Sequence, residues 1–384
     1  MKRNIFIFVL ILSLLSACVP SPQDVRNNSE DVCIPPLFHT AFPIVPQVET
    51  NKVTPRQIPP EGNWQIQSSL PFSQERSILY IRKKRNELIL TSENKMYIYS
   101  IDNDEWNSYT TNKWVGGRLF IDSNDTIWMP VLFLNNSQKQ HPLLSRFNDT
   151  AGQFEFVEDA SGFLQAPNVR LISKIIEDKS GLLWFFVETG NKQILTSFNI
   201  ESNQVEKHYS GGIEGRGNIT IGLDGSIWFS EPFKNQIVQY APSTRETFTY
   251  SYPNPADTGK LPFNFDRANY LFTDSLGHVW TANYGWLEFK NGVPEWHRVI
   301  ESPVFVTDRG LPSSQYTMSY QFSTYQSSNN WYWFTGGAGV VRLDLEIGSW
   351  CLMTTGISDV VEDKEHNLWI AVFGHFYKYP LKLE

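Results

Sequence analysis

One short pattern, a tight turn followed by a strand that carries a large apolar residue, occurs seven times in this sequence of 384 residues. Four of the copies read EDKSGLLWFF at 177–186, IGLDGSIWFS at 221–230, FTDSLGHVWT at 272–281 and VEDKEHNLWI at 361–370. When the copies are aligned, one column holds Trp128, Trp184, Trp228, Trp280, Trp333 and Trp369, with Ile89 as its seventh member. Successive members are 36 to 56 residues apart, a spacing typical of a repeated supersecondary unit.

Every copy also has a residue that tolerates a positive φ angle three positions before the column. These residues are Asn86, Asp125, Gly181, Gly225, Gly277, Asn330 and His366. Because Gly, Asn, Asp and His adopt positive φ more readily than other residues, we predict a tight turn between two strands there. Six positions before the column stand Asp122, Asp178, Asp274 and Asp363, whose carboxylates we expect to cap the backbone N–H groups of the turn.

The strand of the column is followed by two more strand-like segments in most copies, so each copy is typical of a four-stranded antiparallel meander. The last copy stops after its third strand at Glu384, whereas an unassigned strand, NWQIQSS at 63–69, precedes the first copy. Pairing of these two strands would close a ring and protect the sheet edges. We therefore predict an all-β fold, a seven-bladed β-propeller over residues 62–384, in which each tryptophan of the column packs against a neighbouring blade.

The N-terminus is typical of an export signal. Lys2 and Arg3 precede a short apolar run at 5–15, and Leu15-Ser16-Ala17-Cys18 follows. This stretch resembles the lipobox of bacterial lipoproteins, which implies a signal peptide at 1–17 and lipidation of Cys18; an ordinary secretory signal with a chance cysteine is the alternative. Residues 18–61 are rich in proline and are predicted to be a tether. We expect an extracytoplasmic monomer anchored to a bacterial membrane, without deciding which membrane.

The charge and cysteine content limit the partners. Loss of residues 1–17 would change the formal net charge from −8 to −10, and an acidic exported chain is a poor candidate for nucleic-acid binding. The one basic cluster, residues 82–85, is interpreted as a solvated hairpin turn. Cys33 and Cys351 are candidates for a disulfide bond outside the cytoplasm, but spacing alone does not show whether their Cα atoms approach.

The repeats also resemble two known families. IIEDKSGLLWFF at 175–186 and VVEDKEHNLWIAVFGHFYKY at 360–379 are similar to two-component regulator propeller repeats, which form the sensor portions of hybrid histidine kinases. ITIGLDGSIWFSEPFKNQIVQY at 219–240 is similar to the repeat of streptogramin lyases. The lyase resemblance implies a divalent cation held by His and Glu side chains. Only Glu231 matches such a position, so we predict no metal site and no cofactor unless the lyase alternative holds.

Candidate binding residues cluster near the predicted start of the innermost strand in five blades. An arginine stands there, 10 to 14 residues before the column, at Arg76, Arg118, Arg170, Arg216 and Arg267. A ring of guanidinium groups would suit a carboxylate, sulfate or phosphate. The alternative is that these arginines solvate turns or pair with nearby acids. Glu231, which matches the lyase repeat, together with Trp286 and His375 on loops of the predicted rim, completes the candidate ligand-binding set.

No nucleophile motif is present, and no catalytic residue is predicted. We therefore expect a ligand-binding or protein-interaction module, accessory to an envelope sensor, whose partner is an anionic or carbohydrate ligand or an envelope protein. The alternative is a streptogramin-lyase-like or carbohydrate-active enzyme with a divalent metal in the central channel.

Overall fold

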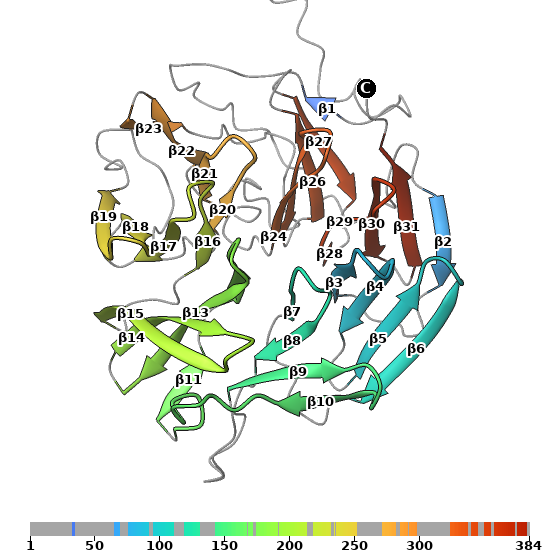
Figure 1. The fold of residues 1–384 in the computed structure, drawn as a ribbon. Coiled ribbons are helices and arrows are strands. Elements are labelled where there is room, and N and C mark those ends of the chain that lie inside the picture. Colours follow the sequence, from blue (N-terminus) through green and yellow to red (C-terminus); the bar gives the residue numbers. More distant parts are fainter. Residues whose placement is uncertain are drawn as a thin grey trace, which may run out of the picture.

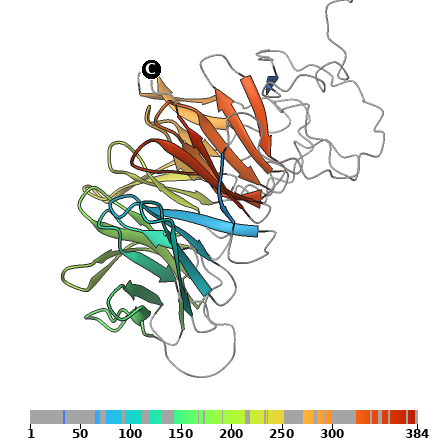
Figure 2. The same ribbon diagram turned by 90° about the vertical axis from the view of Figure 1, so that its right-hand side faces the viewer.

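The protein is an all-β, seven-bladed propeller, as predicted from the sequence (Figure 1). The computed structural model describes residues 33–34, 65–69, 76–91, 95–110, 119–130, 143–166, 168–171, 174–190, 192–212, 218–231, 234, 236–251, 271–281, 285–290, 292–297, 323–336, 339–344, 349–354, 357–372 and 375–381. In this part of the chain the strands form seven sheets arranged in a ring, which Figure 2 shows from the side. No helix among the described residues has the length and apolar character needed to cross a membrane.

The first three blades follow one another along the chain. Blade 1 consists of β3 (Arg76–Arg82), β4 (Glu87–Thr91), β5 (Lys95–Ser100) and β6 (Glu105–Thr110). Blade 2 consists of β7 (Phe120–Ile121), β8 (Ile127–Pro130), β9 (Leu144–Asn148) and β10 (Gln153–Phe156). Blade 3 consists of β11 (Val169–Leu171), β12 (Ile176–Glu177), β13 (Leu182–Thr189), β14 (Lys192–Asn199) and β15 (Gln204–Gly212).

The remaining blades complete the ring. Blade 4 consists of β16 (Ile219–Ile221), β17 (Ile227–Glu231), β18 (Gln236–Ala241) and β19 (Glu246–Ser251). Blade 5 consists of β20 (Leu271–Thr273), β21 (Val279–Thr281), β22 (Gly285–Lys290) and β23 (Val293–His297). Blade 6 consists of β24 (Ser323–Gln326), β25 (Tyr332–Gly336), β26 (Gly339–Asp344) and β27 (Ser349–Thr354), and blade 7 of β29 (Val361–Glu362), β30 (Asn367–Val372), β31 (His375–Pro380) and β2 (Gln65–Ser69).

The ring closes through the N-terminal strand, as predicted. Strand β2 pairs antiparallel with β31, with Ser69 opposite His375 and Gln65 opposite Lys378, and it lies beside β31 in Figure 1. A second bridge between the ends of the chain was not foreseen. Strand β28 (Ile357–Ser358) pairs in parallel with β3, the innermost strand of blade 1. Two segments from the C-terminal part of the chain therefore hold the two ends of the propeller together.

Besides blade 1, which gains β28, two further blades depart from the simple four-strand plan. The innermost strand of blade 3 is divided into β11 and β12, both of which pair with β13. Blade 6 carries an extra outer strand, β1 (Cys33–Ile34), which pairs with β27. The second departure shows that the segment predicted to be a tether contributes two residues to a sheet.

The seven predicted turn residues all have positive φ angles. The values range from 56° at Asn86 to 88° at Gly277, and the set includes Asp125, Gly181, Gly225, Asn330 and His366. The sequence pattern therefore identified the turn position in every blade, because few residue types tolerate this backbone region.

The aspartate found before four of the turns does more than cap them. In blade 2, Asp122 Oδ1 accepts the backbone N–H groups of Asn124 and Thr126 at 2.9 and 2.8 Å. Its Oδ2 accepts the indole N–H of Trp128 at 2.9 Å. The same indole bond recurs at 2.7 to 2.8 Å in the pairs Trp184–Asp178, Trp280–Asp274 and Trp369–Asp363. The cap was predicted; the indole bond, which ties the turn to the buried ring, was not.

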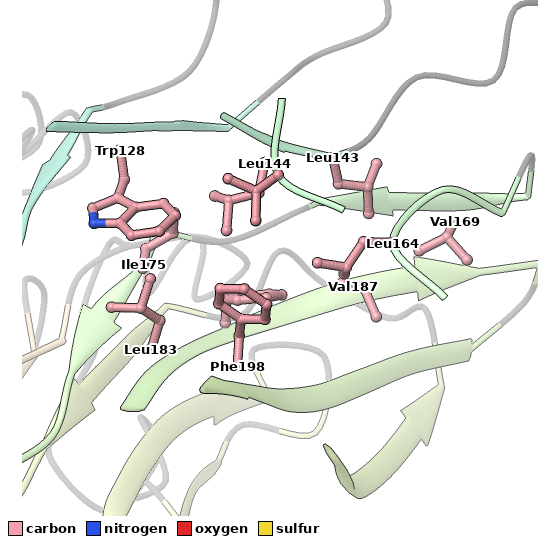
Figure 3. Packing of buried hydrophobic residues seen from close by; sticks show 11 residues of the cluster. Trp128, Leu143, Leu144, Leu164, Val169, Ile175, Leu183, Val187 and Phe198 are labelled. Atoms are coloured by element: carbon pink, nitrogen blue, oxygen red, sulfur yellow. The ribbon is translucent and has the colours of Figure 1, made fainter. Parts of the chain in front are cut away.

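Each residue of the column packs against the following blade, as predicted. Trp128 of blade 2 lies over Phe198 of blade 3 with ring centroids 6.3 Å apart, in a cluster that also contains Leu164 and Leu183 (Figure 3). Trp280 of blade 5 contacts Tyr332 of blade 6 at 4.8 Å in the same way. All seven members of the column are at most 3% exposed. These rings are therefore architectural, since they fill the wedge between adjacent blades.

Hydrogen bonds between neighbouring turns add a polar connection at several junctions. The donor is the backbone N–H of the residue that follows the turn aspartate, or that follows Ser327, which takes the place of this aspartate in blade 6. The acceptor is the side chain of the residue directly before the corresponding position in the next blade. The pairs are Ser123 to Glu177 at 2.6 Å, Ser275 to Gln326 at 2.7 Å and Ser328 to Glu362 at 2.9 Å. Because the same two positions are used at three junctions, we call this contact the inter-blade latch.

The interpretation of residues 82–85 as a solvated turn is wrong for one member. Lys83, Lys84 and Arg85 are exposed in the turn between β3 and β4, but Arg82 is only 1% exposed. Its guanidinium donates to both carboxylate oxygens of Asp149 in blade 2, at 2.7 and 2.9 Å. The acidic partner is distant in sequence, so the local pattern did not reveal the pairing.

Candidate functional site

Strand direction gives the propeller two distinct ends. The seven positive-φ turns lie between the first and second strands of the blades, at what we call the turn end. The first residues of the innermost strands and the connections between second and third strands lie at the opposite end, which we call the loop end. The described candidate binding residues all occupy loop-end positions, within strands and not on the loops expected for Trp286 and His375.

Glu231 is the candidate whose surroundings are best defined. It is the last residue of β17, and its side chain is 14% exposed. Its Oε1 accepts the hydroxyl of Tyr209, from blade 3, at 3.1 Å. Lys234 lies 3.1 and 3.2 Å from the two carboxylate oxygens, and the side-chain amide of Gln236 donates to Oε2. The carboxylate therefore bridges blades 3 and 4 and is already neutralised by donors of this chain.

The space beside Glu231 is narrow on the blade 3 side. A Cβ atom on Gly211 would lie 3.3 Å from Glu231 Oε1 and 3.2 Å from the Tyr209 ring, so a side chain at 211 would crowd both groups. Burial, reinforced by the negative charge of Glu231, raises the pKa of Tyr209 to about 12. Tyr209 therefore remains a protonated donor at neutral pH and holds the carboxylate in place.

Two of the five predicted arginines belong to described strands. Arg76 is the first residue of β3, and Arg170 lies in β11 opposite Glu188 of β13. Both positions are at the loop end of innermost strands, in blades 1 and 3. Arg118, Arg216 and Arg267 lie outside the described residues. The ring of arginines therefore stays a prediction.

Trp286 and His375 also lie at the loop end. Trp286 lies in β22 opposite Trp280 of β21 and His297 of β23. His375 begins β31, is half-buried and has its ring centroid 6.3 Å from that of Tyr377. Blades 4 and 7, which carry Glu231 and His375, lie on opposite sides of the ring (Figure 1). The structure places both residues at the loop end but does not bring them together.

Three other histidines belong to structural networks. His208 Nε2 contacts Ser197 Oγ at 2.8 Å, Nδ1 contacts Tyr240 Oη at 3.1 Å, and burial lowers the pKa of the imidazole. His278 contacts Asp274 at 2.9 Å and His366 contacts Glu362 at 2.6 Å, both at the turn end. Within the described ranges no group of three His, Cys, Asp or Glu side chains is placed to hold a metal ion.

The two cysteines of the disulfide hypothesis meet in the fold. Cys33 in β1 and Cys351 in β27 are register partners of one antiparallel pair. Cys18, the predicted lipidation site, lies outside the described residues.

Comparison with known proteins agrees with the architecture. Virginiamycin B lyase from Staphylococcus aureus superposes with a TM-score of 0.55 and 15% identity, over 83% of this chain and 100% of that chain. A catalytically inactive variant of that lyase, with quinupristin, gives 0.54 and 15% over the same shares. A structure described as the extracellular domain of a hybrid two component system from B. thetaiotaomicron gives 0.51 and 15%, over 80% of this chain and 40% of that chain.

These similarities show that the propeller fold is shared with a lyase and with an extracellular domain of a two component system. At 15% identity they show the fold alone. No protein-family model matches the sequence, and no curated protein matches it significantly.

Proposed function

We propose that this protein is a lipid-anchored, extracytoplasmic propeller that binds an anionic or carbohydrate ligand, or an envelope protein, at its loop end. One observation carries the proposal: the two ends of the propeller use their polar groups differently. At the turn end, repeated carboxylates are saturated by backbone and indole N–H groups of the same chain. At the loop end, an arginine recurs near the start of innermost strands, and Glu231 of blade 4 has a network of donors that its counterpart in blade 7, Val372, cannot form. Polar groups that vary between blades in this way are usual for a binding surface on a rigid scaffold.

The location rests on two supports. The lipobox-like sequence at 15–18 would leave Cys18 as a lipidated first residue. A propeller of the same fold is described as an extracellular domain of a two component system. We therefore propose an accessory to an envelope sensor. A lipid chain on Cys18 would hold the propeller at the membrane through residues 19–61.

The chemistry of the loop end favours a ligand with negative charge. Arg76 is the first residue of the innermost strand of blade 1, and Arg170 is the second residue of that of blade 3. Guanidinium groups bind carboxylate, sulfate and phosphate through paired N–H donors. Glu231 and its donors form a fixed polar edge beside blade 3 that would suit hydroxyl groups of a sugar. Together these groups match an acidic carbohydrate better than a neutral apolar ligand.

A metal-dependent lyase is supported by the shared fold and not by a fit of residues. The described residues supply no set of three ligands. Both oxygens of Glu231 already accept hydrogen bonds, which a cation would have to replace. We therefore derive no metal-dependent step.

A thermal melt of the full chain with Cys18→Ala, which prevents lipidation, tests the proposal. A ligand at one hundred times its dissociation constant stabilises a protein by about 2.7 kcal/mol, which is readily detected. We expect stabilisation by anionic sugars. Stabilisation by divalent cations alone would favour the lyase alternative, and no response to either would direct the search to a protein partner.

A double variant locates the site. Arg170→Gln with Arg216→Gln should abolish the response to the anionic ligand. The matched control, Lys83→Gln with Lys84→Gln, removes two exposed positive charges from the turn end and should leave the response intact. Equal affinity in the first variant and in the unaltered chain would refute the arginine site.

A further inference from the structure

The backbone brings two cysteines from opposite ends of the chain into one strand pair. Cys33 of β1 lies opposite Cys351 of β27, and Ile34 lies opposite Trp350. Strand β27 is the outermost of the four strands of blade 6, so β1 extends that blade by a fifth strand (Figures 1 and 2). The two cysteines are thus neighbours in the sheet although almost the whole propeller separates them in the sequence.

Their register suits a covalent bond. Residues directly opposite each other in an antiparallel pair have Cα atoms about 4.5 to 5.5 Å apart. This spacing lies within the range of about 4.4 to 6.8 Å over which disulfides form without movement of the backbone. Opposite residues of a pair also belong to the same face of the sheet. The question that sequence spacing left open is therefore answered in favour of an approach between the two Cα atoms.

We propose that Cys33 and Cys351 form a disulfide bond that fastens the segment before β2 to blade 6. In this reaction the two thiols lose two protons and two electrons as one S–S bond forms. The electrons reduce a disulfide donor, such as oxidised glutathione or a thiol oxidoreductase, which leaves as two thiols. The bond requires an oxidising compartment, so its occurrence in the cell rests on the extracytoplasmic location proposed above.

The bond would have a mechanical consequence. Strand β2 closes the propeller, and it is held to β31 by strand pairing. Force on a membrane anchor at Cys18 would otherwise reach β2 first, because residues 35–64 connect β1 to it. With Cys33 bonded to blade 6, that force would pass to β27 and leave the closing strand unloaded. We infer that the cross-link protects the closure of the ring in an anchored protein.

Peptide mapping of the full chain tests the bond. The protein is exported from a bacterial host, alkylated before any reductant is added and digested with trypsin. We expect one disulfide-linked species that joins residues 27–52 to residues 343–364, the tryptic peptides of Cys33 and Cys351. It should disappear on reduction. Alkylation of both cysteines before reduction, or a bridge from Cys33 to Cys18 or to a second copy, would overturn the proposal.

A second measurement tests the disulfide proposal independently of the proposed extracytoplasmic location. If fractionation finds the chain in the cytoplasm, the location fails, and the purified reduced chain is then oxidised in a glutathione buffer. The same linked peptides should form; their absence would overturn the bond itself. As a control, Cys351→Ser combined with Ser349→Cys moves the thiol two residues along β27 on the same face. Diagonal neighbours are about 7 to 8 Å apart, so this variant should lose the linked species.

Discussion

The turn end and the loop end of this propeller are built from the same strands but by opposite rules. At the turn end, the same residue types recur at the same positions, and their polar atoms bond to backbone, indole and neighbouring turns. At the loop end, Glu231 in blade 4 has a network of donors that the corresponding position of blade 7 does not repeat. Repetition at the turn end therefore reflects architecture, whereas the loop end combines a recurring arginine position with groups, such as the Glu231 network, that differ between blades.

The largest effect is expected from removing a ring of the column. Trp128→Ala would leave a cavity between blades 2 and 3 and an unpaired oxygen on Asp122, and should lower the free energy of unfolding by about 3 to 5 kcal/mol. Urea unfolding measures the loss. Trp128→Phe keeps most of the packing and removes only the indole donor, so it should cost less. A loss below about 1 kcal/mol for Trp128→Ala would contradict an architectural role.

The second-largest effect is expected at Gly225, where the backbone conformation, and not crowding by neighbours, limits which residue types are tolerated. Gly225 has a φ of 83°, and a Cβ atom there would meet no other atom within 4 Å. Any cost therefore comes from the backbone. Gly225→Val should lower the free energy of unfolding by about 1 to 3 kcal/mol. Gly225→Asn should be nearly neutral, because Asn86 and Asn330 occupy the equivalent turns; equal effects of the two substitutions would refute the explanation.

The latch between blades 6 and 7 predicts a dependence of stability on pH. Burial alone would raise the pKa of Glu362, but hydrogen bonds from Ser328, His366 and Tyr325 outweigh burial and hold this pKa below its usual value. The contribution to stability is therefore complete above the ordinary glutamate pKa near 4.5 and is lost as the pH falls through the lower pKa of the folded state.

Melting temperatures recorded from pH 7 to pH 3 would test this. Glu362→Gln should lose less stability on acidification than the unaltered chain. Glu365→Gln removes an exposed carboxylate from the same turn and serves as the control. If the unaltered chain and Glu362→Gln lose stability in parallel, the latch does not depend on ionised Glu362.

The smallest effect on stability is expected at the loop end. Lys234 is 50% exposed and pairs with Glu231 at 3.1 Å. Exposed pairs contribute about 0 to 1 kcal/mol, so Lys234→Ala should barely change urea unfolding. It should nevertheless alter ligand binding if the Glu231 network contributes to the site. If Lys234→Ala lowered the free energy of unfolding as much as Trp128→Ala does, the proposed difference between the loop end and the turn end would be refuted.

The candidate site was less predictable than the fold because its evidence is not periodic. Glu231 was selected from a repeat match, but its donors Tyr209 and Gln236 come from strands whose register the sequence did not specify. Similarly, the latch residues Glu177 and Glu362 precede turn aspartates without a common residue type at that position in every blade. Arg82 was misread for the same reason, because its partner Asp149 belongs to the next blade.

Local physics explains what could be read directly from the chain. A positive φ is tolerated by few residue types, and the buried space between blades requires a large apolar side chain. Both requirements recur in every blade, so the sequence pattern reveals the number of blades. Polar contacts between distant segments leave no such mark, because they depend on how far and at what angle those segments approach. The register of Cys33 with Cys351 and the enclosure of Arg82 were therefore decided only when the ring was assembled.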